Sequence, residues 1–200
     1  MTETKTHKFL KDVGMAFLFN QNCFLVATEA HISRGGQERL GKLDQHYIID
    51  VCGVGEKYIP PSERDYVLVG SVRDYTTSRY KYNIVRGIEV KVSRSDFKNG
   101  LVCSGCNYNY LMIPEGLVYS YEVPAEVGII AVDRKNFTAS FEPAPTFRFD
   151  FKGVRIIRKP TFKKIEQYQI DNAISSIAKR STRELINRVA QNLSVCGSKS

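Results

Sequence analysis

The sequence predicts an α/β or α+β fold built around one mixed central β-sheet. Short segments rich in β-branched and aromatic residues follow one another through the middle of the chain, and polar or glycine-containing stretches separate them. Apolar residues at helical spacing occur instead near both ends, over residues 5–21 and beyond Pro160. Strands that lie between helical segments are typical of a sheet on which helices pack.

The strands of this sheet are predicted by five apolar, β-rich segments, which are residues 23–32, 46–55, 83–93, 106–114 and 128–133. A helix is expected before them within residues 5–21, and a short helix or turn in residues 94–105, with Ser93 as its cap. The stretch 56–82 is expected to be an excursion between two strands, because the prolines at 60–61 lack the backbone N–H that strand pairing uses.

The C-terminal part is expected to form a hairpin followed by helices. Polar and apolar residues alternate over 136–158, which predicts two paired strands. From Pro160 the pattern becomes helical, with Thr161 as the expected N-cap and Ser181 and Thr182 as the expected break between two helices. The apolar stripe of these helices consists of Ile165, Tyr168, Ile174, Ile177, Leu185, Ile186, Val189 and Leu193.

The positive charge is concentrated toward the C-terminus. The chain has a net charge of +8, and residues 146–200 alone contain twelve basic and four acidic residues, so they account for the whole excess. We therefore distinguish a neutral core, residues 1–145, from a basic hairpin and helical extension, residues 146–200, packed on or next to it. A basic segment on a neutral body favours a polyanion such as nucleic acid as partner, and a solvated surface is the alternative. The basic residues expected to contact nucleic acid are Arg34, Arg79, Lys163, Lys164, Lys179, Arg180 and Arg183.

The sequence is expected to belong to a cytoplasmic protein with no membrane association and no small-molecule cofactor. No apolar run approaches the roughly 20 residues that span a bilayer, and the N-terminal segment has no signal-peptide core. The five cysteines are an odd number at low density, which argues against a disulfide framework. Cys103 and Cys106 form one CxxC. Ordinary thiols are favoured there over a metal or redox pair, because zinc needs about four ligands and no second CxxC is present.

Three acidic residues lie inside otherwise apolar predicted strands: Glu29 in LVATEAHI, Asp50 in YIIDVCGV and Glu89 in GIEVKV. Lys91 follows Glu89 by two positions, so both side chains point to the same face of the strand. Carboxylates within buried strands cost free energy unless they are paired or bind a cation. Three of them on adjacent strands would converge on one divalent metal. Lys91 would then orient an attacking water or stabilise negative charge developing on a phosphate.

Structural roles are the alternatives at these positions. Glu89 and Lys91 would form a salt-bridged pair on a solvent-facing edge strand. Glu29 would be an exposed strand residue, and Asp50 would precede a turn.

The amino-acid sequence around these acids resembles that of a known nuclease family. Asp50 followed by Glu89-Val90-Lys91 resembles the D…(D/E)xK signature of the PD-(D/E)XK nuclease superfamily, and Glu29 matches the additional acid of many members. The segments GIEVKVSRSDF, CNYNYLMIP and AEVGIIAVD are similar to the MmcB-like branch of DNA-repair nucleases. The resemblance covers residues 8–135. It departs from the family pattern in the long segment between Asp50 and Glu89 and in the abbreviated helix that follows.

The resemblance implies a restriction-endonuclease-like mixed sheet flanked by helices, with the acids at one edge. It implies a Mg²⁺- or Mn²⁺-dependent DNA-repair endonuclease that hydrolyses phosphodiester bonds of DNA with a metal-activated water. By position, Asp50, Glu89 and the Val90 carbonyl would bind the metal. Lys91 would be the catalytic lysine, and Glu29 would be a supporting acid or a ligand of a second metal.

Two other functions remain open at this point. The first is a catalytically weak or inactive nucleic-acid-binding module of the same fold. The second is an interaction protein stabilised by zinc at Cys103 and Cys106. A homodimer would let a nuclease cut both strands of a duplex, and nothing in the sequence demands one.

Overall fold

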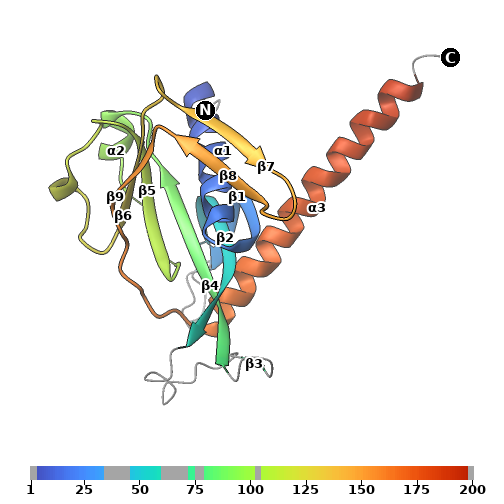
Figure 1. The fold of residues 1–200 in the computed structure, drawn as a ribbon, viewed down its shortest axis with the longest axis horizontal. Helices are drawn as coiled ribbons and strands as arrows, with labels where there is room; N and C mark the ends of the chain where they lie inside the picture. Colours follow the sequence, from blue (N-terminus) through green and yellow to red (C-terminus); the bar gives the residue numbers. More distant parts are fainter. Residues whose placement is uncertain (1–3, 34–45, 60–71, 75–78, 102–104, 198–200) are drawn as a thin grey trace, which may run out of the picture.

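A mixed β-sheet with helices packed on it forms the body of the protein (Figure 1). The computed structural model describes residues 4–33, 46–59, 72–74, 79–101 and 105–197. The strands are β1 (Cys23–Ser33), β2 (His46–Ile59), β3 (Val72–Asp74), β4 (Arg79–Val90), β5 (Tyr108–Pro114), β6 (Gly128–Val132), β7 (Thr138–Glu142), β8 (Arg148–Lys152) and β9 (Val154–Arg158). The helices are α1 (Lys5–Asn20), α2 (Arg94–Lys98), α3 (Gln167–Gly197) and the 3₁₀ turn η2 (Ser120–Glu122). The predicted α/β class is confirmed.

The main sheet has seven strands in the order β1-β2-β4-β5-β6-β9, with β3 paired to β4 beside this path. β1, β2 and β4 are successively antiparallel, whereas β4, β5 and β6 are parallel. β9 closes the far side as an antiparallel neighbour of β6. The sheet is therefore mixed, as predicted, and each of the five predicted segments supplies one of its strands.

Two apolar cores lie on the two faces of this sheet. α1 buries Leu10 and Phe17 in one core, and α3 buries Ile177 in the other. Val51 and Cys52 are consecutive residues of β2 that belong to different cores, as expected for side chains that alternate across a strand. Each fully buried side chain of this kind contributes about 1.5–3 kcal/mol to stability. The cores thus fix both helices against the sheet.

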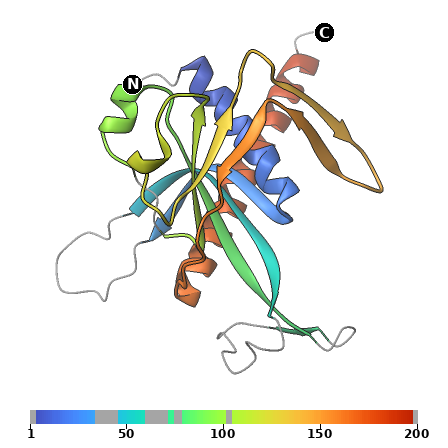
Figure 2. The same cartoon turned by 60° about the vertical axis from the view of Figure 1, so that its left-hand side comes forward.

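The β2–β4 pair is longer than predicted. β2 continues to Ile59 and β4 begins at Arg79, and the two strands remain paired to their ends. They form an arm that carries β3 at its end and extends beyond the remaining strands (Figure 2). The prediction of an excursion over residues 56–82 is therefore wrong for residues 56–59 and 79–82, which belong to strands, while residues 60–71 and 75–78 lie outside the described part of the chain.

The segment 136–158 contains a hairpin and one strand of the main sheet, where a single hairpin was predicted. β7 and β8 pair with each other and stand apart from the main sheet (Figure 2). The chain then turns at Gly153, whose φ is +78° and where a Cβ would lie 2.8 Å from the Asp133 carbonyl oxygen. That turn, which requires glycine, redirects the chain so that β9 pairs with β6. The boundary expected at residue 145 falls in the connection between β7 and β8.

α3 begins six residues after its predicted cap. The Thr161 N–H donates to the Glu126 carbonyl at 2.9 Å, and the Lys163 N–H donates to the Asn107 carbonyl at 2.8 Å. These long-range bonds hold the segment before α3 in an irregular path along the body. The prediction of an N-cap at Thr161 is wrong, because local propensity does not reveal such partners.

α3 is one continuous helix, so the predicted break at 181–182 is also wrong. Both side chains there are exposed, and serine and threonine that face solvent leave a helix intact. The first half of α3 packs along β1, where Ser176 Oγ accepts the His31 N–H at 2.8 Å. The second half leaves the body (Figure 1). Its apolar stripe is exposed there, by 60% at Leu185, 59% at Ile186 and 44% at Val189. Within the described part of the chain, no helix has both the length and the apolar content needed to cross a membrane.

Replacing Asn107 is expected to destabilise the fold. This buried side chain accepts the Val85 N–H at 2.8 Å and donates to the Lys163 carbonyl at 3.0 Å, which joins β4 to the segment before α3. Asn107→Ala leaves a buried N–H and a carbonyl without partners, and we expect a loss of roughly 1–3 kcal/mol in the free energy of unfolding. Urea unfolding measures this loss, with the exposed Asn187→Ala as the control. Equal stability of the two variants would contradict the prediction.

Candidate functional site

β2 and β4 separate beside the acidic residues. Their ladder ends at the pair Val51↔Ile88, whereas β2 remains paired with β1 and β4 remains paired with β5 beyond this point. Asp50 and Glu89 are the next residues on the two strands. The two carboxylates are therefore brought to the same level, at the place where the sheet opens.

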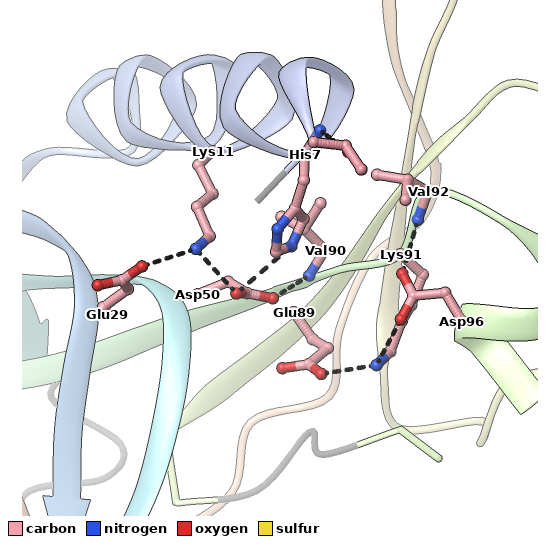
Figure 3. Close-up of polar contacts among 10 residues, drawn as sticks. His7, Lys11, Glu29, Asp50, Glu89, Val90, Lys91, Val92 and Asp96 are labelled. Atoms are coloured by element: carbon pink, nitrogen blue, oxygen red, sulfur yellow. Dashed lines mark hydrogen bonds and ion pairs between the residues drawn. The ribbon is translucent and has the colours of Figure 1, made fainter. Parts of the chain in front are cut away.

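Glu29 lies at this level on β1. Its two neighbours in the chain pair with the two neighbours of Asp50, so Glu29 stands opposite Asp50. The backbone of Glu29 has φ +53°, a left-handed conformation that costs a non-glycine residue on the order of 1–3 kcal/mol. The structure thus brings the three predicted acids together on three adjacent strands (Figure 3).

The Asp50 carboxylate contacts one backbone N–H and two side chains from α1. Its Oδ2 accepts the Val90 N–H at 2.8 Å, just past the last β2–β4 pair. Its Oδ1 lies 3.4 Å from Lys11 Nζ and 3.5 Å from His7 Nε2 (Figure 3). Asp50 therefore fixes the opened strand β4 and joins it to the overlying helix.

Glu89 and Lys91 form a buried ion pair, with 3.1 Å between Oε1 and Nζ. Lys91 Nζ also lies 3.6 Å from Asp96 Oδ1, and Asp96 Oδ2 accepts the Val92 N–H at 3.0 Å. Asp96 is in the first turn of α2, a helix capped by Ser93 as predicted. The pair does not face open solvent, so the alternative of a solvent-facing salt bridge does not describe it.

Burial and neighbouring charge perturb both members of this pair. Burial, followed by the negative charge of Asp50, raises the pKa of the Glu89 carboxyl to about 7 against the lowering effect of Lys91. Burial alone would lower the pKa of the Lys91 ammonium, but Glu89, Asp96 and Asp50 together raise it above its usual value. Lys91 is therefore a cation at neutral pH. The Glu89 carboxyl, with its pKa of about 7, can gain or lose a proton near neutral pH.

Glu29 contacts cations from two different helices. Its Oε1 lies 3.2 Å from Lys11 Nζ of α1, and its Oε2 lies 3.1 Å from a guanidinium nitrogen of Arg180 in α3. Arg180 also pairs with Glu184, one helical turn further along, at 2.9 Å. Arg180, which the sequence suggested as a nucleic-acid contact, thus belongs to the charge cluster around the acids.

Sequence reasoning missed His7, Lys11 and Asp96. His7 and Lys11 lie four residues apart on α1 and therefore point the same way. Lys11 is only 6% exposed. A lysine directly beside Leu10, within the apolar helical pattern of residues 5–21, was the available signal, since a charged side chain in a buried stripe needs a partner.

The other predicted nucleic-acid contacts are dispersed. Lys163 and Lys164 are exposed before α3, and Lys179 and Arg183 are exposed four residues apart on α3 itself. Arg34 lies outside the described residues, and Arg79 opens β4 without a described side chain.

A divalent metal at these acids would rely on two carboxylates. Among the described residues, no group of three or more His, Cys, Asp or Glu side chains has an arrangement that could hold a metal ion. Asp50 and Glu89 remain as a pair, and Mg²⁺ in proteins often uses one or two carboxylates together with waters and substrate phosphates. The donor chemistry of this pair fits such an ion, and Asp50 also contacts Lys11 and His7. Of the CxxC, Cys106 is buried and Cys103 lies outside the described residues.

Comparison with known proteins adds little to this site. No family model matches the sequence, and no curated protein matches it. Among solved structures, the chain is similar to the SPO1766 protein of unknown function from Silicibacter pomeroyi, with 16% sequence identity and a TM-score of 0.49. The similarity covers 92% of this chain and 90% of that chain.

The raised pKa of Glu89 predicts a pH dependence of stability. Since this pKa is about 7 in the folded protein and 4.5 for an ordinary glutamate, the folded state binds more protons between these values. The contribution of Glu89 therefore becomes less favourable as pH rises from 4.5 to above 7, by up to about 3 kcal/mol. We expect the free energy of unfolding of Glu89→Gln, minus that of the wild type, to increase over this range.

Urea unfolding at several pH values measures this difference. Glu126→Gln, at an exposed glutamate, is the control and is expected to give a constant difference. A constant difference for Glu89→Gln as well would contradict the prediction.

Proposed function

We propose that the protein is a metal-dependent nuclease that hydrolyses phosphodiester bonds of DNA. The observation that carries the proposal is the meeting of Asp50, Glu89 and Lys91 where β2 and β4 separate. The two carboxylates supply oxygen ligands for a cation. The ammonium of Lys91 supplies a positive charge that can contact a phosphate. The resemblance of the sequence to the PD-(D/E)XK nucleases supports the same function. A mixed sheet flanked by helices agrees with the restriction-endonuclease-like fold that we propose with it.

Asp50 and Glu89 would hold a Mg²⁺ or Mn²⁺ ion. When bound, such an ion polarises the phosphodiester and lowers the pKa of a coordinated water. The carboxyl of Glu89 would bind it in the ionised form, so a nearby divalent charge would bring its pKa down from about 7. The N–H of Val90 holds Asp50 in place for this role.

Lys91 would act on the substrate. Its ammonium is held between Glu89 and Asp96, and its raised pKa keeps it charged. In this position it would orient the attacking water or stabilise negative charge developing on the phosphate. Asp96 is a positioning residue, because it fixes the ammonium and is itself fixed by the Val92 N–H.

The basic C-terminal segment supports DNA as the substrate. Lys179 and Arg183 present two charges on one exposed side of α3, and Lys163 and Lys164 add two more before the helix. Such residues bind the phosphate backbone without reading base sequence. Arg180 connects this helix to the acids through Glu29.

Replacing Lys91 is expected to abolish cleavage. Labelled linear, circular, nicked, single-stranded and branched DNAs are incubated with wild type or Lys91→Ala in Mg²⁺, Mn²⁺ or EDTA. We expect cutting by the wild type only with metal, and a loss of about 100-fold or more in Lys91→Ala, because one preorganised charge is removed. Lys98→Ala, an exposed lysine at the end of α2, is the control. Thermal unfolding verifies that each variant is folded. The proposal fails if the wild type cuts no DNA, or if Lys91→Ala cuts as fast as the wild type.

A binding module of the same fold is the second candidate. The observation that favours it is that protein groups already contact both oxygens of Asp50 and of Glu29. For such a module we expect DNA binding in EDTA that weakens steeply with salt and is unchanged in Glu89→Ala. Fluorescence anisotropy of labelled DNA measures it, with Glu126→Ala as the control. Binding that requires Mg²⁺ and is lost in Glu89→Ala would exclude this candidate.

A further inference from the structure

Lys11 occupies an unusual position for a lysine. It lies in the middle of α1, 6% exposed, and the neighbouring Leu10 and Val13 anchor this part of the helix in the core. Its ammonium is 3.2 Å from Glu29 Oε1 and 3.4 Å from Asp50 Oδ1 (Figure 3). A single cation thus bridges carboxylates from two adjacent strands.

The imidazole of His7 approaches the same Asp50 Oδ1 at 3.5 Å, and the other two cations of the cluster contact different carboxylate oxygens. Lys91 pairs with Glu89 and Asp96, and Arg180 contacts the second oxygen of Glu29. Lys11 is therefore the side chain that lies between Glu29 and Asp50. Two ionised carboxylates at one level of adjacent strands repel each other, so the space between them favours a cation.

A divalent metal could not share this space with the ammonium. Mg²⁺ binds carboxylate oxygens at about 2.0–2.1 Å, and the positive charge of Lys11 would repel it at such a distance. The two cations are thus alternatives for the same pair of carboxylates.

We propose that the Lys11 ammonium is a built-in cation that takes the place, between Glu29 and Asp50, of a second divalent ion. The candidate active site would then bind one metal ion, at Asp50 and Glu89, and Glu29 would position Lys11 instead of binding metal. This inference rests on the proposed function only for the metal ion at Asp50 and Glu89. It assigns a role to a residue that the D…(D/E)xK pattern does not include.

The number of metal ions bound tests the inference without any measurement of cleavage. Metal-free wild type, Lys11→Met and Lys8→Met are titrated with Mn²⁺ and followed by calorimetry and by the electron paramagnetic resonance of free Mn²⁺. Methionine keeps the length and apolar stem of lysine, and Lys8 is an exposed lysine of the same helix. We expect one Mn²⁺ per chain for the wild type and Lys8→Met, and two for Lys11→Met.

Thermal unfolding provides a second readout. Without metal, Lys11→Met is expected to unfold at a lower temperature than the wild type, because two carboxylates lose their shared cation. Mn²⁺ is expected to raise its unfolding temperature more than that of the wild type. Lys11→Gln, which is also uncharged, is expected to behave in the same way.

Each outcome decides between the inference and the proposed function. Equal numbers of ions in Lys11→Met and wild type, or two ions in the wild type, would overturn the inference. No ion in the wild type with one in Lys11→Met would uphold the role of Lys11 and overturn the proposed one-metal site. No ion in either protein would overturn both.

Discussion

The end of the β2–β4 ladder is the constraint on which the site depends. If β2 and β4 stayed paired beyond this point, Asp50 and Glu89 would lie inside a continuous sheet and not at an opening between two strands. Because the pairing stops at Val51↔Ile88, the N–H of Val90 needs another acceptor, and the Asp50 carboxylate supplies it. The same hydrogen bond closes the ladder and holds an acid at the opening. The hydrogen bond between Val90 and Asp50 therefore contributes both to the fold and to the candidate site.

The charges around this opening are tolerated because they are distributed. Four carboxylates, those of Glu29, Asp50, Glu89 and Asp96, contact the cations of Lys11, Lys91 and Arg180, and Asp50 also contacts the imidazole of His7. Each of these cations contacts two carboxylates, and the second one for Arg180 is that of Glu184. Removing Lys91 would take away the ion pair of the buried Glu89 carboxylate, and breaking a buried pair in this way costs more than the net stability that the intact pair contributes. The pKa of the Glu89 carboxyl is nevertheless raised, because the effect of burial is larger than the lowering effect of Lys91.

The sequence was informative where local pattern and burial coincide. The apolar runs of β5 and β6 and the helical stripe of α1 predicted those elements, because their side chains are buried in the way the pattern indicates. Glu29, Asp50 and Glu89 stood out because charge interrupts such runs. Lys11 did not stand out, since its role depends on how α1 lies over β1 and β2. The start of α3 and the pairing of β9 were mispredicted for the same reason, since bonds to residues distant in sequence, such as Asn107, determine both.

The packing of α3 on β1 also affects whether a strand of another molecule can pair with the edge of the sheet. β1 is the outermost strand on its side of the sheet, and an open strand of this kind offers backbone groups to which another chain can add. Ser176 already binds the outward N–H of His31, and the left-handed residue Glu29 interrupts the regular strand. On the opposite side, the arginines of β9 are held by contacts within the protein, because Arg155 pairs with Glu115 at 2.6 Å and Arg158 donates to the Val127 carbonyl at 2.8 Å. The helix α3 thus protects the β1 side of the sheet against intermolecular strand addition.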